Sequence, residues 1–142
     1  MKNKMKIYIA SSWKNQHAVE MLTALLREKG HEVKSFVEDG LKRNISGEGF
    51  EKWMKTEDAD GAFEHDSGGA IFSDCCIYIS PSGKDAAAEC GMAYASGKFM
   101  IALYAKGEDF GLMRKMFADR WCSRYTQVID LVEQYDLILK AA

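Results

Sequence analysis

Two carboxylates, Asp66 and Glu89, stand among small and apolar residues on either side of the apolar run 75–79. An ionised side chain in such surroundings is costly unless something uses it. Two carboxylates can cleave an acetal-like bond to a sugar carbon, because one attacks the carbon while the other gives a proton to the leaving group. Unlike environments would separate the pKa values of the two groups. The pair is therefore a candidate acid and nucleophile.

Glu89 follows a turn of small residues at 80–83. Ser82 and Asp85 have the Ser-x-x-acid spacing of a helix N-terminus, so we expect them to cap a helix over 85–96. Glu89 then lies beyond the reach of the helix dipole, next to Ala88 and Cys90. The alternative is that Glu89 lies on the solvated face of this helix, as most glutamates do.

Asp66 lies in a helical pattern that begins at Thr56. Its position falls between Phe63 and Ala70 on the apolar stripe, which also contains Ala59 and Ala62, so the carboxylate is predicted to point inward. The alternative is that Gly68-Gly69 ends the helix early and leaves Asp66 exposed.

The order of the elements predicts an α/β fold. Strands are expected at 7–10, 32–37, 75–79 and 99–104, with a short fifth near Trp121. Helices are expected in the segment that ends at Gly30, from 56 onward, over 85–96 and over 125–139, and 38–56 is predicted to be a loop with a short helix. Strands that alternate with helices favour a parallel sheet covered on both faces, and length favours one domain over 1–142.

Ligands of such sheets lie beyond the carboxyl ends of the strands. The turns after the first and third strands carry Ser11, Ser12, Ser82 and Gly83, which could hold sugar hydroxyls or a 5′-phosphate, and Trp13 or Trp53 could stack on a base. Serine is also the commonest capping residue, so each serine has a purely structural alternative. Phe50 and Trp53 suggest that the segment from Glu38 to Trp53 covers the site.

Composition excludes several classes of function. The 142 residues are 47% hydrophobic and 28% charged, and the net charge of −2 comes with scattered lysines and arginines, so neither a nucleic acid polymer nor a membrane surface is an expected partner. The four cysteines have no metal-type spacing and are expected to be reduced, in a cytoplasmic protein. There is no signal-like segment, no span of about 20 apolar residues and no Gly-rich phosphate loop.

Several motifs together resemble the nucleoside 2-deoxyribosyltransferase-like family over nearly the whole chain. The matching segments are 7–12, Asp66, Ser73-Asp74, Ser82-Gly83, 88–93 and 97–103, and the Glu-x-Gly-x-Ala pattern from Glu89 followed by Gly-Lys is the most specific of them. The resemblance implies a flavodoxin-like, Rossmann-like three-layer sandwich with a central parallel sheet of four to five strands. It also implies cleavage of the N-glycosidic bond of a nucleoside or nucleoside 5′-monophosphate.

By this resemblance, Glu89 would be the nucleophile on the anomeric carbon and Asp66 would help to protonate the departing base, while Asp74 would be structural. The substrate-binding residues would be Ser11, Ser12, Trp13, Ser82, Gly83, Asp85 and Met92. No metal or organic cofactor is required, and a homodimer or larger homo-oligomer is expected.

The chain departs from the family pattern at two positions. Gly83 stands where transferases carry an acid, six residues before the nucleophile, and Asp85 stands where hydrolase-like relatives have a serine, four residues before it. Hydrolysis and transfer to another base therefore both stay open. Two alternatives from other classes are a TIR-like NAD hydrolase, which also has a glutamate after a central strand, and a non-catalytic nucleotide-binding or sensor module.

Overall fold

The fold is built on a parallel sheet whose strands are separated by helices. A computed structural model describes residues 5–39 and 47–141. The strands are β1 (Lys6–Ala10), β2 (Glu32–Ser35), β3 (Cys75–Ile79), β4 (Phe99–Leu103) and β5 (Trp121–Cys122). They form one sheet in the order β2-β1-β3-β4-β5, and every neighbouring pair is parallel. The predicted flavodoxin-like fold with a short fifth strand is confirmed.

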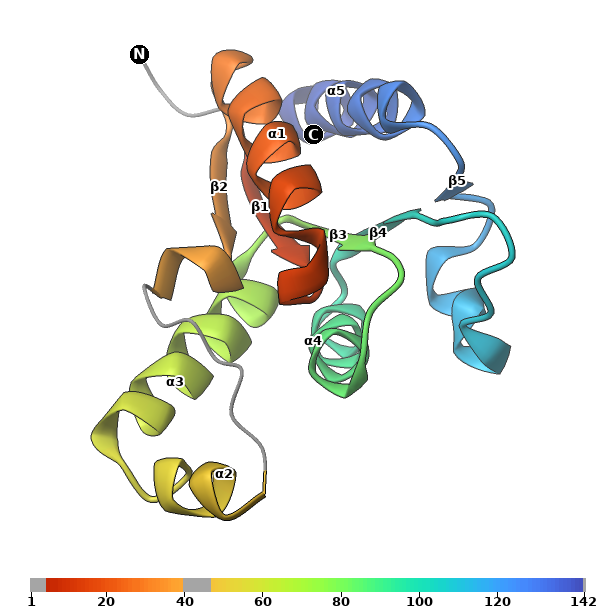
Figure 1. Cartoon of the computed structure of the whole chain (residues 1–142). Helices are drawn as coiled ribbons and strands as arrows, with labels where there is room; N and C mark the ends of the chain where they lie inside the picture. The colour runs from red at the N-terminus through yellow and green to blue at the C-terminus, as the bar shows by residue number, and fades with distance from the viewer. Residues whose placement is uncertain (1–4, 40–46, 142) are drawn as a thin grey trace.

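Helices cover both faces of this sheet (Figure 1). The α-helices are α1 (Gln16–Glu28), α2 (Gly47–Trp53), α3 (Glu57–Phe72), α4 (Lys84–Ala95) and α5 (Tyr125–Ala141). Short 3-10 helices occur at Trp13–Asn15, Phe36–Asp39 and Gly111–Phe117. Helices α1 and α5 lie on one face, and α3 and α4 lie on the other, which gives the three layers that the sequence predicts.

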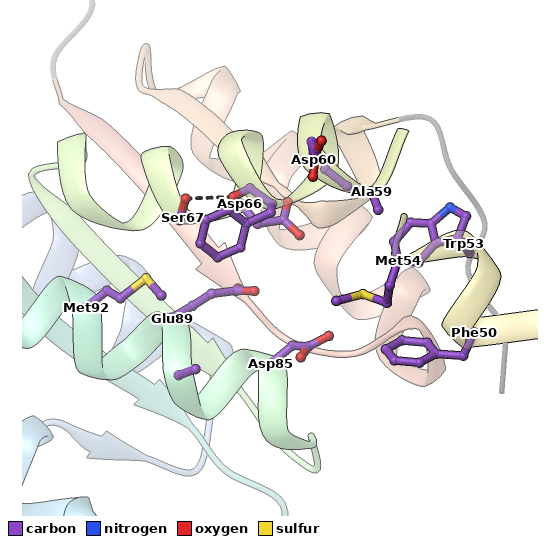
Figure 2. A pocket seen from close by; sticks show the side chains of 13 residues that line it. Phe50, Trp53, Met54, Ala59, Asp60, Asp66, Ser67, Asp85, Glu89 and Met92 are labelled. Carbon is purple, nitrogen blue, oxygen red and sulfur yellow. Dashed lines mark hydrogen bonds between the residues drawn. The ribbon is translucent and has the colours of Figure 1, made fainter. Parts of the chain in front are cut away.

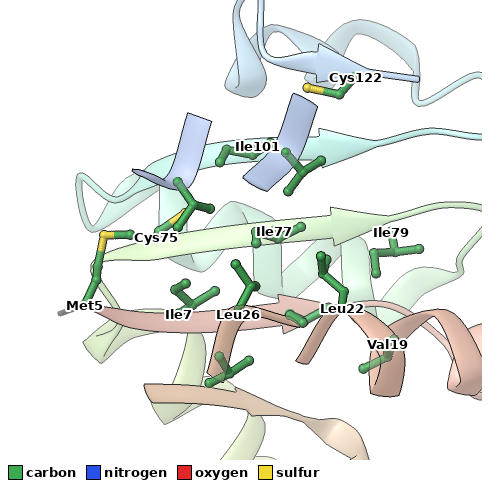
Figure 3. Close-up of a cluster of buried hydrophobic side chains, with 14 of the residues drawn as sticks. Met5, Ile7, Val19, Leu22, Leu26, Cys75, Ile77, Ile79, Ile101 and Cys122 are labelled. Atoms are coloured by element: carbon green, nitrogen blue, oxygen red, sulfur yellow. The ribbon is translucent and has the colours of Figure 1, made fainter. Parts of the chain in front are cut away.

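Alternation along the strands divides the core into two clusters. In β1, Ile7 and Ile9 face α1 and α5, whereas Tyr8 and Ala10 face α3 and α4. Figure 3 shows the first cluster, in which Leu22 and Leu26 of α1 pack on the aliphatic strand residues. On the other face, the buried residues of α4 apart from Glu89 are small (Ala86, Cys90 and Ala93), so that this helix packs close to the sheet. Glu89 is therefore held close to β1.

Three local predictions are corrected. The second strand ends at Ser35 instead of continuing to 37, because the chain turns into the 3-10 helix Phe36–Asp39, where Phe36 packs edge-on against Trp13 with ring centroids 5.0 Å apart. Helix α3 continues through Gly68-Gly69 to Phe72, so the early helix end is wrong. The N-cap of α4 is Gly83, with no side-chain cap, so the predicted cap by Ser82 is also wrong.

Other structural features agree with the predictions made from the sequence. Asp74 accepts a 2.8 Å hydrogen bond from the backbone N–H of Lys6 at the start of β3, consistent with a structural role. All four cysteines are free and buried. Within residues 5–39 and 47–141, no helix combines the length and the apolar character that crossing a membrane requires.

Candidate active site

Two adjoining cavities lie beside α3 and α4 and share Asp66, Asp85 and Glu89. The larger, of about 430 Å³, is lined by Phe50, Trp53, Met54, Ala59, Asp60, Ala62, Phe63, Asp66, Ser67, Asp85, Ala88, Glu89 and Met92. The smaller, of about 330 Å³, is lined by Ser11, Ser12, Trp13, Phe36, Asp66, Ser82, Gly83, Lys84, Asp85, Ala86 and Glu89. The structure thus gathers every residue predicted for the site around one crevice.

Glu89 is held by a tyrosine from the middle of β1. The Tyr8 hydroxyl donates a 2.8 Å hydrogen bond to Glu89 Oε1, and this contact is buried, since Tyr8 is 0% exposed and Glu89 is 7% exposed. Burial raises the pKa of the Tyr8 phenol far above its usual range, and the charges of Glu89 and Asp66 raise it further. The phenol therefore stays protonated at neutral pH, where it serves as a hydrogen-bond donor to the carboxylate. The alternative of a solvated Glu89 is wrong.

Tyr8 reaches this position because α3 has no side chain at residue 69. A Cβ built on Gly69 would lie 2.4 Å from Cδ1 and 2.6 Å from Cε1 of Tyr8, closer than real Cβ contacts. The neighbouring Gly68 has no such constraint, since its nearest atom is Cδ2 of Phe72 at 3.9 Å. Gly69 therefore permits close packing of α3 on β1 and leaves room for the ring of Tyr8.

Asp66 enters the crevice from α3, opposite Glu89 on α4 (Figure 2). It is half-buried and lines both cavities, so its predicted inward orientation is confirmed. Phe63, expected on the same buried stripe, is instead 64% exposed and forms part of the wall of the larger cavity. The buried residues of α3 are the small ones, Ala59, Ala62 and Ala70.

Ser11 and Asn15 join the turns that follow β1 and β3. The Ser11 hydroxyl donates to the carbonyl of Ile79 at 2.7 Å and accepts from Asn15 Nδ2 at 3.0 Å. The same amide donates to the carbonyl of Pro81 at 2.6 Å. These bonds occupy the hydroxyl of Ser11, so this residue shapes the smaller cavity chiefly by holding its two turns together.

The hydroxyls of Ser12 and Ser82 differ from that of Ser11. Both oxygen atoms are buried and have no hydrogen-bond partner among the described residues. Both residues line the smaller cavity, at the turns where strands β1 and β3 end. Buried hydroxyls usually find a partner, so these two are available to a polar ligand in the crevice.

Aromatic and thioether side chains complete the walls. Trp13 is half-buried in the smaller cavity, where its ring contacts Phe36. Phe50 and Trp53 of α2 line the larger one, opposite Met92 of α4, so the segment expected over the site contributes part of its wall (Figure 2). Residues 40–46 of that segment lie outside the described residues.

Sequence reasoning missed Tyr8, Gly69 and Asn15. Tyr8 reads as one more apolar residue of a strand, and only strand alternation, which places it on the face opposite Ile7 and Ile9, separates it from the aliphatic core. Gly69 reads as a helix breaker. No local signal marks Asn15 as a link between two turns, because its carbonyl partners lie 64 and 66 residues further along the chain.

A metal site is not evident in the part of the chain that the structure describes, where no group of three His, Cys, Asp or Glu residues is placed to hold an ion. The described polar side chains that line the crevice carry hydroxyls, carboxylates, the indole N–H groups of Trp13 and Trp53, and the ammonium of Lys84. Such a set suits an organic ligand with several hydroxyl groups.

Comparison with solved structures finds proteins that share this architecture. A structure of the 2-deoxyribosyltransferase from the psychrotolerant bacterium Bacillus psychrosaccharolyticus is 23% identical, with a TM-score of 0.64 over 86% of this chain and 88% of that one. The Clostridium botulinum CMP N-glycosidase is 19% identical, with a TM-score of 0.58 over 89% of this chain and 97% of that one. Neither known family profiles nor the sequences of curated proteins match this chain. The structural likeness establishes the shared fold.

Proposed function

We propose that this chain belongs to the nucleoside 2-deoxyribosyltransferase-like family and cleaves the N-glycosidic bond of a nucleoside or nucleoside 5′-monophosphate. One observation carries the proposal: Glu89, oriented by Tyr8, shares a crevice with Asp66 in the fold of a deoxyribosyltransferase and a CMP N-glycosidase. The substrate is a small molecule, and the reaction requires only groups of the protein. Hydrolysis and transfer to a second base share the first chemical step.

In that first step, a carboxylate oxygen of Glu89 attacks the anomeric carbon of the sugar. A carbon–oxygen bond forms, the carbon–nitrogen bond to the base breaks, and its electron pair leaves with the base. Asp66 gives a proton to the departing base, so the base leaves as a neutral molecule. The hydrogen bond from Tyr8 holds the attacking carboxylate in one orientation.

In the second step, water or another base attacks the same carbon and the bond to Glu89 breaks. Asp66, now ionised, takes the proton of the incoming nucleophile. With water, the products are the free sugar and the free base; with a base, the product is a new nucleoside. Glu89 and Asp66 return to their starting protonation states in both cases.

The walls of the crevice carry groups that can bind both parts of such a substrate, the base and the sugar. Trp13 offers an aromatic face for a base, and the hydroxyls of Ser12 and Ser82 can bond to a sugar. Gly83 and Asp85 border the same cavity, and Met92 borders its neighbour. We further propose that the protein is a cytoplasmic homodimer or larger homo-oligomer in which a neighbouring copy completes the crevice.

The proposal is tested by chromatographic detection of free base. The purified protein, beside a Glu89→Ala variant, is incubated with a panel of nucleosides, their 5′-monophosphates and NAD. Release from a nucleoside or a monophosphate that disappears in the variant supports the proposal. Release from NAD alone would favour a TIR-like hydrolase, and no release would favour a nucleotide-binding module; both outcomes contradict the proposal.

A further inference from the structure

The residue that precedes Asp66 joins α3 to the edge strand of the sheet. The Nε2 atom of His65 lies 3.0 Å from the carbonyl oxygen of Ser35, the last residue of β2. A carbonyl oxygen only accepts hydrogen bonds, so Nε2 carries a proton and is the donor. Ser35 is buried and His65 is half-buried, which shields the contact in part from water. His65 lines neither cavity, so it does not touch a substrate bound there.

The stretch of α3 around His65 faces a cavity more than the core. Residues 63–69, all of which the structure describes, include no buried side chain. Three of them line the larger cavity, and two others, Gly68 and Gly69, are glycines in the helix interior, which lower helix stability. Because few buried side chains hold this stretch, a single directional bond contributes much to fixing its position.

The accepting end of this bond lies beside the smaller cavity. Ser35 is followed by Phe36, whose ring packs against Trp13, and both aromatic residues line that cavity. The bond from His65 therefore connects the helix that carries Asp66 with the wall proposed to bind the base. A displacement of this turn of α3 would move Asp66 relative to the base that it protonates.

We propose that His65 is a positioning residue whose hydrogen bond to Ser35 holds Asp66 in place to protonate the departing base. This inference rests on the proposed N-glycosidic cleavage and adds a residue to its acid step. A proton donor must lie within hydrogen-bond reach of the atom that it protonates, so loss of the bond lowers the rate at which the base departs. Glu89 lies on α4, so the orientation of the nucleophile does not depend on this bond.

Three substitutions of His65 test the bond on the best substrate of the panel. His65→Leu removes the donor and should lower kcat by about fivefold to tenfold, the effect of one hydrogen bond, with little change in KM. His65→Gln keeps an N–H group at a similar distance from the backbone and should restore most of kcat. His65→Asn is too short to reach Ser35 and should behave like His65→Leu. Glu64→Gln, at the exposed preceding position, is the matched control and should equal the wild type.

A double-mutant cycle with Asp66→Asn separates positioning from a general structural effect. Asp66→Asn removes the acid, so His65→Leu should change kcat by less than about twofold in that background. A role in folding or in the shape of the crevice would instead lower kcat by the same factor in both backgrounds. Base release is followed over a longer incubation in the slow variants, and circular dichroism checks that each variant is folded.

The outcomes distinguish this inference from the proposed function. An equal effect of His65→Leu with and without Asp66 would overturn the role of His65 and leave the cleavage reaction intact, as would equal kcat values for His65→Asn and His65→Gln. The comparison of these last two variants decides the question if His65→Leu does not fold. Absence of base release by the wild type would refute the proposed cleavage and, with it, this role in the acid step.

Discussion

The hydroxyl of Tyr8 and the carboxylate of Glu89, 81 residues apart in the chain, form a buried 2.8 Å hydrogen bond behind the wall of the crevice. Tyr8 comes from the sheet and Glu89 from the helix that covers it, so the packing of α4 on β1 sets the position of the proposed nucleophile. A hydrogen bond to an ionised group is worth about 1.5–3 kcal/mol. A hydrogen bond of this strength is large enough to affect the turnover rate, so the effect of removing it by mutation can be measured.

We expect Tyr8→Phe to lower kcat by about tenfold to a hundredfold, because the carboxylate loses the donor that orients it. KM should change little, since Tyr8 lies behind Glu89 and lines neither cavity. Tyr135→Phe is a matched control, because Tyr135 packs against Phe99 on the opposite face of the sheet and lines neither cavity. Activity of Tyr8→Phe equal to that of this control would show that the bond does not orient the nucleophile.

Gly69→Ala should destabilise the fold by about 1–3 kcal/mol, because the new methyl group would overlap the ring of Tyr8. Gly68→Ala, one residue away, should instead be stabilising by up to about 1 kcal/mol, because it replaces a helical glycine without a clash. Urea denaturation of both variants measures the difference. Similar effects of the two substitutions would contradict the close packing of α3 on Tyr8.

Asn15→Ala should raise KM by about threefold to tenfold, because the amide that links the turns after β1 and β3 is lost together with about 1 kcal/mol of stability. Lys14→Ala, at an exposed neighbouring position, is the control and should leave both quantities unchanged. Steady-state kinetics and thermal denaturation check this expectation. An Asn15→Ala protein with the KM of the wild type would place the substrate away from these turns.

The raised pKa of Tyr8 predicts a loss of stability in alkali. In the unfolded chain the phenol ionises near its ordinary pKa of 10.0, whereas in the folded protein burial and the nearby carboxylates keep it neutral. Ionisation then favours the unfolded state, so the contribution of Tyr8 is fully present below pH 10 and decreases above it, by about 1.4 kcal/mol per pH unit. Urea denaturation at pH 9, 10 and 11 should therefore show a steeper decline for the wild type than for Tyr8→Phe. Parallel declines would refute this.

The order of strands and helices could be predicted because hydrophobic spacing is local, and the inward position of Asp66 followed from the same spacing. Non-local contacts could not be predicted in this way. The partner of Glu89 is 81 residues away, and Gly69 permits an approach of Tyr8 that only the folded chain reveals. The second strand ends early for the same reason, since Phe36 packs on Trp13 instead of extending the sheet.

The N-terminus of α4 shows a limit of a different kind. Ser82 and Asp85 have the spacing of a helix cap, but the N-cap is Gly83, one residue after Ser82, and the Ser82 hydroxyl has no partner among the described residues. Side chains that depart from the local rules of helix capping are expected at functional sites, such as the wall of a ligand-binding cavity. Capping residues and ligand-binding residues are the same types, so sequence alone does not separate these roles.

The most direct test of the central claim is the rate of base release by wild-type protein and by Glu89→Gln, on the best substrate of the panel. Glutamine keeps the size of the side chain and removes its nucleophilic charge, and circular dichroism checks that the fold is unchanged. We predict release by the wild type and a rate lower by about a thousandfold or more in the variant. A Glu89→Gln protein that releases base at the wild-type rate would contradict the account.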